Sequence, residues 1–185
     1  RWVTAALVSA VGRSAVLGLS AALVILILAV ALASSWRHDR SPAMESVVRT
    51  ATVGYAVPGP VIALGALLPI AWLDQRFSGF LVAMGRAPRL LLLSTGVGLL
   101  AALVSRFFAV GYHPIAAGLE GSGRRIGEVA RSLGAGPLRA LARIEIPVIR
   151  REILAAGVLI VVELIKELPI TLILRPFNFD TLATR

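Results

Sequence analysis

The stretch from Ser14 to Ala33 contains twenty residues without a charge. As a helix it would match the hydrocarbon core of a bilayer, which takes about 20 residues to cross. Comparable apolar stretches recur three times in the 185 residues, of which 57% are hydrophobic. The pattern predicts an all-α, polytopic transmembrane helical bundle with four spans, at 14–33, 50–73, 90–112 and 152–174.

The two ends of the sequence indicate a piece of a longer protein. It begins with Arg1 instead of methionine and stops at Arg185, soon after the fourth apolar stretch. We therefore expect residues 1–13 to be the tail of a preceding segment and residues 14–185 to be the transmembrane domain, with its last span missing.

The net charge of +9 comes from eighteen arginines and a single lysine against ten carboxylates. Ten of the arginines lie in two segments between the apolar stretches, 34–50 and 113–151. Excess positive charge in connecting loops marks the cytoplasmic side of a membrane protein, which explains the basic balance without a nucleic-acid partner. The absence of cysteine excludes disulfides and thiolate metal sites.

The longest segment outside the apolar stretches, 113–151, has the pattern of two short helices joined by a corner. Gly134 suits the left-handed position that closes a helix, which glycine occupies at little cost. Gly136 suits the residue before the next helix, and Pro137 suits its first residue, where a missing N–H costs nothing. We expect a stiff helical hairpin that projects from the cytoplasmic face.

The second apolar stretch contains Pro58, Gly59 and Pro60 near its start. Proline removes a helical hydrogen bond and restricts the residue before it, so these residues predict a kink or a broken turn. Two interpretations remain open, because the break could line a translocation path or could be a packing kink. Gly96 and Gly98 are expected to be packing residues.

Three charged side chains, Glu163, Lys166 and Glu167, lie inside the fourth apolar stretch. Charges within a span face one another or a cavity, and spacings of three and four residues place these on one face of a helix. A structural ion pair that holds a kinked helix is the favoured interpretation, and a passing contact with a hard cation such as Fe³⁺ is the alternative. Arg106, near one end of the third stretch, is expected to reach the interface.

No other pattern in the sequence predicts chemistry. The only lysine lies inside an apolar stretch, so the chain lacks a phosphate-binding loop for ATP. His38 and His113 are too far apart and too isolated to predict a metal site. No nucleophile, base and orienting group occur together, so we expect no catalytic residue, no metal site and no enzymatic activity.

The corner segment resembles a motif of the permease subunits of binding-protein-dependent ABC importers. That motif has Glu-Ala-Ala, three residues, Gly, nine residues and then Ile-x-Leu-Pro, and this chain matches it at Glu128, Ala130, Gly134, Ile144 and Pro147. It departs at Val129 and Ile146, where the motif has alanine and leucine. The resemblance implies a coupling helix that docks into a groove of an ATPase subunit, with the coupling residues at Glu128, Ala130, Gly134, Ala135, Gly136 and Pro137.

Three further stretches resemble the ferric-iron branch of these permeases: YAVPGPVIALG (55–65), RFFAV (106–110) and KELPITLILRPFNFDTLATR (166–185). The resemblance covers roughly residues 14–185 and implies the C-terminal half of a type I permease. It implies a multi-pass protein of the bacterial inner membrane that transports ferric iron. The candidate residues of the translocation path are Pro58, Gly59, Pro60, Glu163, Lys166 and Glu167.

The same resemblance implies the partners of the chain. An ATPase dimer would carry ATP and Mg²⁺, so the chain itself would bind no cofactor. A periplasmic or lipid-anchored binding protein would deliver the cargo, and a second permease half, fused or separate, would complete the path through the bilayer. Thiamine, a polyamine or sulfate are alternative cargoes, and an ion-coupled carrier or channel with Glu163 and Glu167 as relays is an alternative of a different class.

Overall fold

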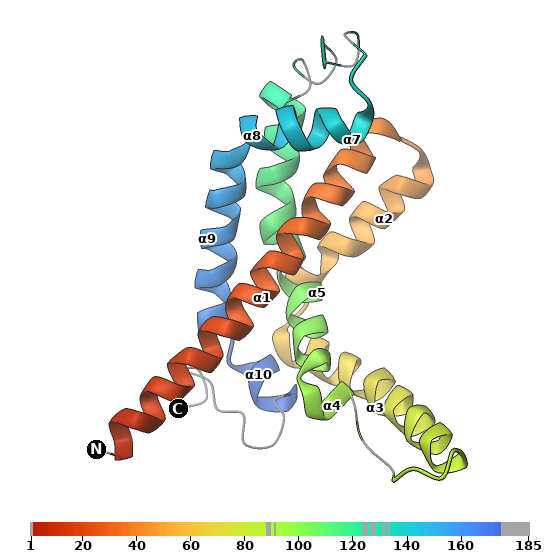
Figure 1. Cartoon of the computed structure of the whole chain (residues 1–185), viewed down its shortest axis with the longest axis vertical. Coiled ribbons are helices and arrows are strands. Elements are labelled where there is room, and N and C mark those ends of the chain that lie inside the picture. Colours follow the sequence, from red (N-terminus) through yellow and green to blue (C-terminus); the bar gives the residue numbers. More distant parts are fainter. Residues whose placement is uncertain are drawn as a thin grey trace.

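The computed structural model describes residues 2–87, 90, 92–123, 126, 129, 130, 132 and 134–174, and every regular element in them is helical (Figure 1). The long helices are α1 (Trp2–His38), α3 (Gly59–Ala83), α5 (Val97–Gly118) and α9 (Arg150–Lys166). The shorter elements are α2 (Pro42–Thr52), the 3-10 turn η1 (Val53–Ala56), α4 (Leu92–Thr95), the π-helical turn η2 (Leu119–Gly123), α7 (Pro137–Ala140), the π-helical turn η3 (Leu141–Glu145), α8 (Ile146–Val148) and α10 (Pro169–Leu174).

Two helical stretches are long and apolar enough to cross a membrane, Ser14–His38 and Val97–Gly121. A third is added if Pro42–Ala56 and Gly59–Ala83 are counted as one span, although these two parts are bent by 119°. The predicted all-α fold is therefore confirmed for the described residues, and two or three of its helical stretches are long and apolar enough to cross a membrane. About four spans were expected, and two of the four expected stretches are each divided between two helices.

The apolar stretch 50–73, expected to form one span, is divided between two helices. α2 ends at Thr52, η1 follows, and Val57 is extended with φ −84° and ψ 133° before α3 begins at Gly59. Pro58 explains the division, because proline disfavours the helical conformation of the residue before it. The predicted break at 58–60 is present, and a continuous helix over 50–73 is not.

The stretch 152–174, expected to form the fourth span, is divided in the same way. α9 ends at Lys166, Glu167 is extended with φ −79° and ψ 99°, and α10 begins at Pro169. Pro169 disfavours a helical Leu168 as Pro58 disfavours a helical Val57. α9 has 17 residues, fewer than the roughly 20 of a typical span.

The third expected span, 90–112, lies further along the chain than predicted. α5 begins at Val97, after Gly96, whose φ of 76° ends the short α4. Gly96, expected to be a packing residue, makes a left-handed turn. Gly98 is a packing residue, as expected, because a Cβ there would lie 2.9 Å from Cδ1 of Ile70 on α3.

Two other helices are longer than the sequence predicted. α1 extends beyond 14–33 on both sides, so residues 2–13, expected to be the tail of a preceding segment, continue into the first apolar stretch as one helix. α3 continues to Ala83, through residues between the expected spans 50–73 and 90–112. The chain turns away from the helix at Gly85, whose φ is 72°, with the N–H of Arg86 donating to the carbonyl oxygen of Leu81 at 2.9 Å.

The core is centred on α5, which packs between α1 and α9 (Figure 1). Gly111 is the point of closest approach, because a Cβ there would lie 2.7 Å from Cγ2 of Ile25 and 3.0 Å from Cδ1 of Ile160. A small residue at a helix crossing lets the backbones come together, as in other membrane helix bundles. The side chains of Ile25, Phe107, Ile115 and Ile160 are fully buried around this crossing.

Asp74 joins α3 to α4. Its carboxylate is completely buried and accepts the N–H of Leu92 at 2.8 Å and the N–H of Leu93 at 2.9 Å. These are N–H groups of the first turn of α4, which have no partner within the helix. Asp74 thus caps α4 from a helix almost twenty residues earlier in the sequence, and so holds the start of α5 against α3.

We expect Asp74→Ala to lower the free energy of unfolding by about 1–3 kcal/mol, because two N–H groups lose their acceptor. Gln75→Ala, an exposed neighbour on the same helix, is the matched control and should change it by less than about 0.5 kcal/mol. Thermal unfolding of the detergent-solubilised protein measures both. Equal losses in the two variants would show that the cap does not hold α4.

Candidate functional site

A short helical segment, formed by α7, η3 and α8 (residues 137–148), lies across one end of the bundle (Figure 1). We call it the transverse segment. The end of α1, the start of α2 and the start of α9 are at this same end of the bundle. The described parts of the two Arg-rich segments of the sequence therefore come together at this end, as expected if both segments face the same side of a membrane.

The corner before the transverse segment has the predicted geometry. Gly134 has φ 86°, and the N–H of Ala135 donates to the carbonyl oxygen of Ala130 at 3.0 Å. This is the bond of a helix that closes on a left-handed glycine. Gly136 then is the extended residue before α7, and Pro137 is the first residue of that helix.

The residues before the corner are described only in part. Ala130 is buried and helical, whereas Val129, at the position where the permease motif has alanine, is exposed. Glu128, the first residue of the resemblance, lies outside the described residues. The structure therefore describes five of the six predicted coupling residues: Ala130, Gly134, Ala135, Gly136 and Pro137.

The transverse segment has one buried face and one exposed face. Ala140 and Glu145 are buried and five residues apart, the spacing of the π-helical turn that separates them. Leu138 is 79% exposed, and Arg139 and Arg143 are exposed on the same short segment. An exposed leucine flanked by arginines, on a segment fixed at a corner, is a surface suited to a protein partner.

An ion pair attaches the transverse segment to α1. Nη2 of Arg37 lies 2.6 Å from Oε2 of Glu145, and the two side chains are only 6% and 1% exposed. The other polar atoms of the pair, Nε and Nη1 of Arg37 and Oε1 of Glu145, are buried and have no hydrogen-bond partner among the described residues. The pair is thus buried, and one hydrogen bond joins its two side chains.

A second polar site lies where the two helix breaks meet. Nε of Arg106, on α5, donates to Oε2 of Glu167 at 3.1 Å, and Nη1 of Arg106 donates to the carbonyl oxygen of Val57. Oε1 of Glu167 accepts the N–H of Ile170 in α10 at 3.3 Å. One guanidinium therefore satisfies groups at both breaks, and we call this set the break junction.

Gly59 is part of the break junction because it leaves room for the side chains of Glu167 and Arg106. A Cβ at this position would lie 2.7 Å from Oε1 of Glu167 and 3.6 Å from Cζ of Arg106. Two of the predicted path residues, Gly59 and Glu167, are thus brought together by the fold. Pro58 and Pro60 flank Gly59, and both are exposed.

The other two predicted path residues lie apart from the break junction. Nζ of Lys166 lies 3.4 Å from Oε1 of Glu163, and the Lys166 side chain is 63% exposed. The predicted ion pair within α9 is present, but it does not neutralise the buried carboxylate. Glu167 pairs with Arg106, whose side chain is 19% exposed, so the guanidinium of Arg106 is held at the break junction.

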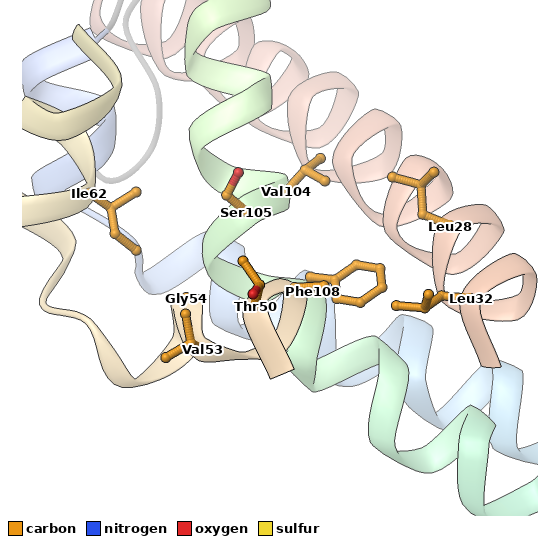
Figure 2. Close-up of a pocket in the computed structure, with 10 residues that line it drawn as sticks. Leu28, Leu32, Thr50, Val53, Gly54, Ile62, Val104, Ser105 and Phe108 are labelled. Carbon is orange, nitrogen blue, oxygen red and sulfur yellow. The ribbon is translucent and has the colours of Figure 1, made fainter. Parts of the chain in front are cut away.

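An apolar groove of about 520 Å³ lies between α1, α2, α3 and α5 (Figure 2). Its walls include Leu28 and Leu32 from α1 and Phe108 from α5, and Ser105 is one of two hydroxyl residues in it. The Ser105 hydroxyl donates to the carbonyl oxygen of Ala101, within its own helix. No charged residue lines the groove, so it offers a place for hydrocarbon and none for a metal ion.

Within the described residues, no group of three or more His, Asp and Glu side chains is arranged to hold a metal ion. His38 and His113 are both exposed. His113 lies on α5 with its ring 5.6 Å from that of Tyr112, and His38 ends α1. The histidines therefore give no candidate metal centre.

Sequence reasoning missed three of the residues that organise these sites: Arg37, Arg106 and Glu145. Arg106 could have been found, because an arginine inside an apolar stretch needs a partner, and Glu167 was a charge in another such stretch. The Arg37–Glu145 pair could not have been found in this way, because neither residue lies in an apolar stretch. Both residues lie in polar segments, where most charged side chains are solvated.

Searches against family models and against curated proteins gave no match to this sequence. The geometry of the transverse segment and of the break junction is therefore the basis for a functional assignment.

We expect Gly59→Ala to lower the free energy of unfolding by about 1–3 kcal/mol, since the new methyl group overlaps the Glu167 carboxylate. Gly65→Ala is the matched control on the same helix, where a Cβ meets no atom within 4 Å. It should raise stability by up to about 1 kcal/mol, because alanine favours a helix over glycine. Thermal unfolding in detergent distinguishes them, and a harmless Gly59→Ala would contradict the close approach.

Arg106→Leu should lower the free energy of unfolding by about 3–5 kcal/mol, because it leaves the Glu167 carboxylate buried without its cation. Lys166→Leu removes a cation from a neighbouring but exposed pair and should cost less than about 1 kcal/mol. Denaturation of the two variants in the same detergent gives the comparison. If Lys166→Leu were the more damaging, the pairing of Glu167 would be misassigned.

Proposed function

We propose that this chain is a transmembrane permease subunit of an ATP-driven importer, and that the transverse segment docks onto a separate ATPase subunit. The observation that carries the proposal is the corner at Gly134 with the transverse segment behind it. A left-handed glycine, an extended Gly136 and Pro137 at the helix start fix the direction of α7. A helical segment held rigidly across the end of a membrane bundle can transmit a push from a soluble partner.

The exposed face of the segment supports a protein partner. Leu138 is the most exposed large apolar side chain of the described residues, and Arg139 and Arg143 lie beside it on the same segment. Arginine is enriched at protein interfaces because its planar guanidinium binds carboxylates with two hydrogen bonds. We propose that Leu138 enters an apolar pocket of the ATPase and that the arginines bind acidic residues around it.

The proposed mechanism is alternating access driven by the partner. ATP and Mg²⁺ bind to the ATPase, whose closure moves the transverse segments of two permease halves towards each other. The helices then change between an inward-open and an outward-open arrangement, because the partner has different affinities for the two. A binding protein delivers the cargo on the side of the membrane opposite the ATPase. This chain supplies the transverse segment that the ATPase moves, and part of the translocation path.

The proposed cargo is ferric iron, on the resemblance of 55–65, 106–110 and 166–185. The break junction adds an argument about how the path works. The Glu167 carboxylate already binds Arg106 and the N–H of Ile170, so it offers little capacity to trap a hard cation. A site that binds cargo weakly suits an importer, since tight binding would prevent release. The alternative cargoes are thiamine, a polyamine or sulfate.

An ion-coupled carrier or channel is the second candidate, and the burial of Glu167 favours it. In this function Glu163 and Glu167 would relay ions, and no ATPase would be needed. Against it, Glu163 pairs with Lys166 on the outside of α9, while Glu167 is engaged at the break junction. The two carboxylates are therefore bound by different cations, Glu163 by Lys166 and Glu167 by Arg106.

Two aspartate substitutions at the corner test the proposed docking. Gly134→Asp introduces a side chain at φ 86° and a negative charge at a helix C-terminus, and both are unfavourable. Gly136→Asp introduces the same charge at φ −62°, before a helix N-terminus, where aspartate is favoured. We expect Gly134→Asp to lose the co-purifying ATPase subunit from membranes, and Gly136→Asp to retain it.

Uptake of radiolabelled ferric iron in cells lacking the gene is the second readout of these variants. We expect the wild type and Gly136→Asp to restore uptake, and Gly134→Asp to fail at a normal protein level. An ATPase recovered at wild-type yield with Gly134→Asp would contradict the coupling role. If cells take up iron equally with and without the wild-type gene, the coupling role is unaffected, and the cargo is one of the alternatives instead of iron.

A further inference from the structure

The Arg37–Glu145 pair has features of a contact that is made and broken. A guanidinium and a carboxylate can form two parallel hydrogen bonds, but this pair forms one, at 2.6 Å. Three polar atoms of the pair are buried without a hydrogen-bond partner among the described residues. A buried ion pair is strongly stabilising only when its remaining hydrogen bonds are made, so this one is poorly suited to be a permanent brace.

The winding of the transverse segment gives the pair a means to separate. Glu145 is the last residue of the π-helical turn η3, between two short α-helical turns. A single π turn holds one residue more than an α turn, so conversion between them moves the side chains that follow it. A change of winding at η3 would therefore move Glu145 relative to Arg37, which is fixed on the last turn of the long helix α1.

The helix that follows the transverse segment also carries a buried polar atom without a hydrogen-bond partner among the described residues. Glu152, in the first turn of α9, packs at the end of α5: a Cβ on Gly118 would lie 3.0 Å from its Cγ. Its Oε2 atom is buried and has no hydrogen-bond partner among the described residues. The contact of α9 with α5, directly after the transverse segment, is thus close-packed but incompletely bonded, as the Arg37–Glu145 pair is.

We propose that the Arg37–Glu145 pair is a releasable latch, which holds the transverse segment against α1 in the present conformation and separates when a docked partner draws the segment away. This inference rests on the proposed function, because the ATPase supplies the force. The two charges regain water when they part, which offsets the loss of their attraction. An apolar pair in the same place would gain no such compensation and would stay closed.

The first test replaces the charges with apolar side chains in the full-length protein. Glu145→Leu alone leaves Arg37 buried and unpaired, so we expect a lower melting temperature. Arg37→Met with Glu145→Leu should restore the melting temperature of the wild type or exceed it. The same double variant should lower ATP hydrolysis by the complex in lipid nanodiscs about tenfold, a change within the usual range of coupling between sites.

The matched control uses the exposed pair at the same end of the bundle. Arg40 and Glu120 lie 2.7 Å apart with side chains 51% and 48% exposed, so water screens them. Arg40→Gln with Glu120→Gln should leave both the melting temperature and ATP hydrolysis at wild-type values. If the double variant with Arg37→Met and Glu145→Leu is stable and supports ATP hydrolysis at the wild-type rate, the latch is overturned, because the pair is then only structural.

Hydrogen exchange on the unmodified complex tests the latch without any substitution. The amides of residues 141–149 should exchange faster when the ATPase is trapped in its ATP-bound state with vanadate than when it is free of nucleotide. Equal exchange in the two states would overturn the latch. If no ATPase co-purifies with the wild-type chain, the proposed function fails and the latch fails with it, a result distinct from either outcome above.

Discussion

The guanidinium of Arg106 is the group on which the arrangement of the helices depends. Two apolar stretches are interrupted by prolines, and an interruption inside a bilayer exposes backbone groups that lipid cannot satisfy. Arg106 binds the Val57 carbonyl at one break and the Glu167 carboxylate at the other, while Glu167 binds an N–H of α10. A single side chain from the central helix thus allows two broken helices to exist side by side.

The same central helix connects this junction to the opposite end of the molecule. α5 carries Arg106 at the breaks, Gly111 where α1 and α9 cross it, and Gly118 against the first turn of α9. Each of these positions is a close contact that a larger or uncharged residue would alter. α9 spans the same route, because it contacts α8 at its start and is followed by Glu167 at its end, so we propose that movement of the transverse segment reaches the breaks along α9 and the α5 helix packed against it.

The sequence predicted well the features that depend on local backbone chemistry. The corner at Gly134, the helix start at Pro137 and the break at Pro58 follow from the preferences of glycine and proline, and all three are present. Features that depend on pairing across the fold were not predictable in the same way. The Glu163–Lys166 pair was expected from helical spacing, whereas the partner of Glu167 comes from a residue 61 positions away.

The most direct measurement places a photo-crosslinking amino acid at Leu138 of the full-length protein in living cells. We predict an adduct that contains an ATP-hydrolysing subunit, identified by mass spectrometry. The same amino acid at Leu68, which is 73% exposed on α3, should give no such adduct. Adducts at Leu138 that lack an ATPase, or that match those at Leu68, would contradict the central claim that the transverse segment is the docking surface.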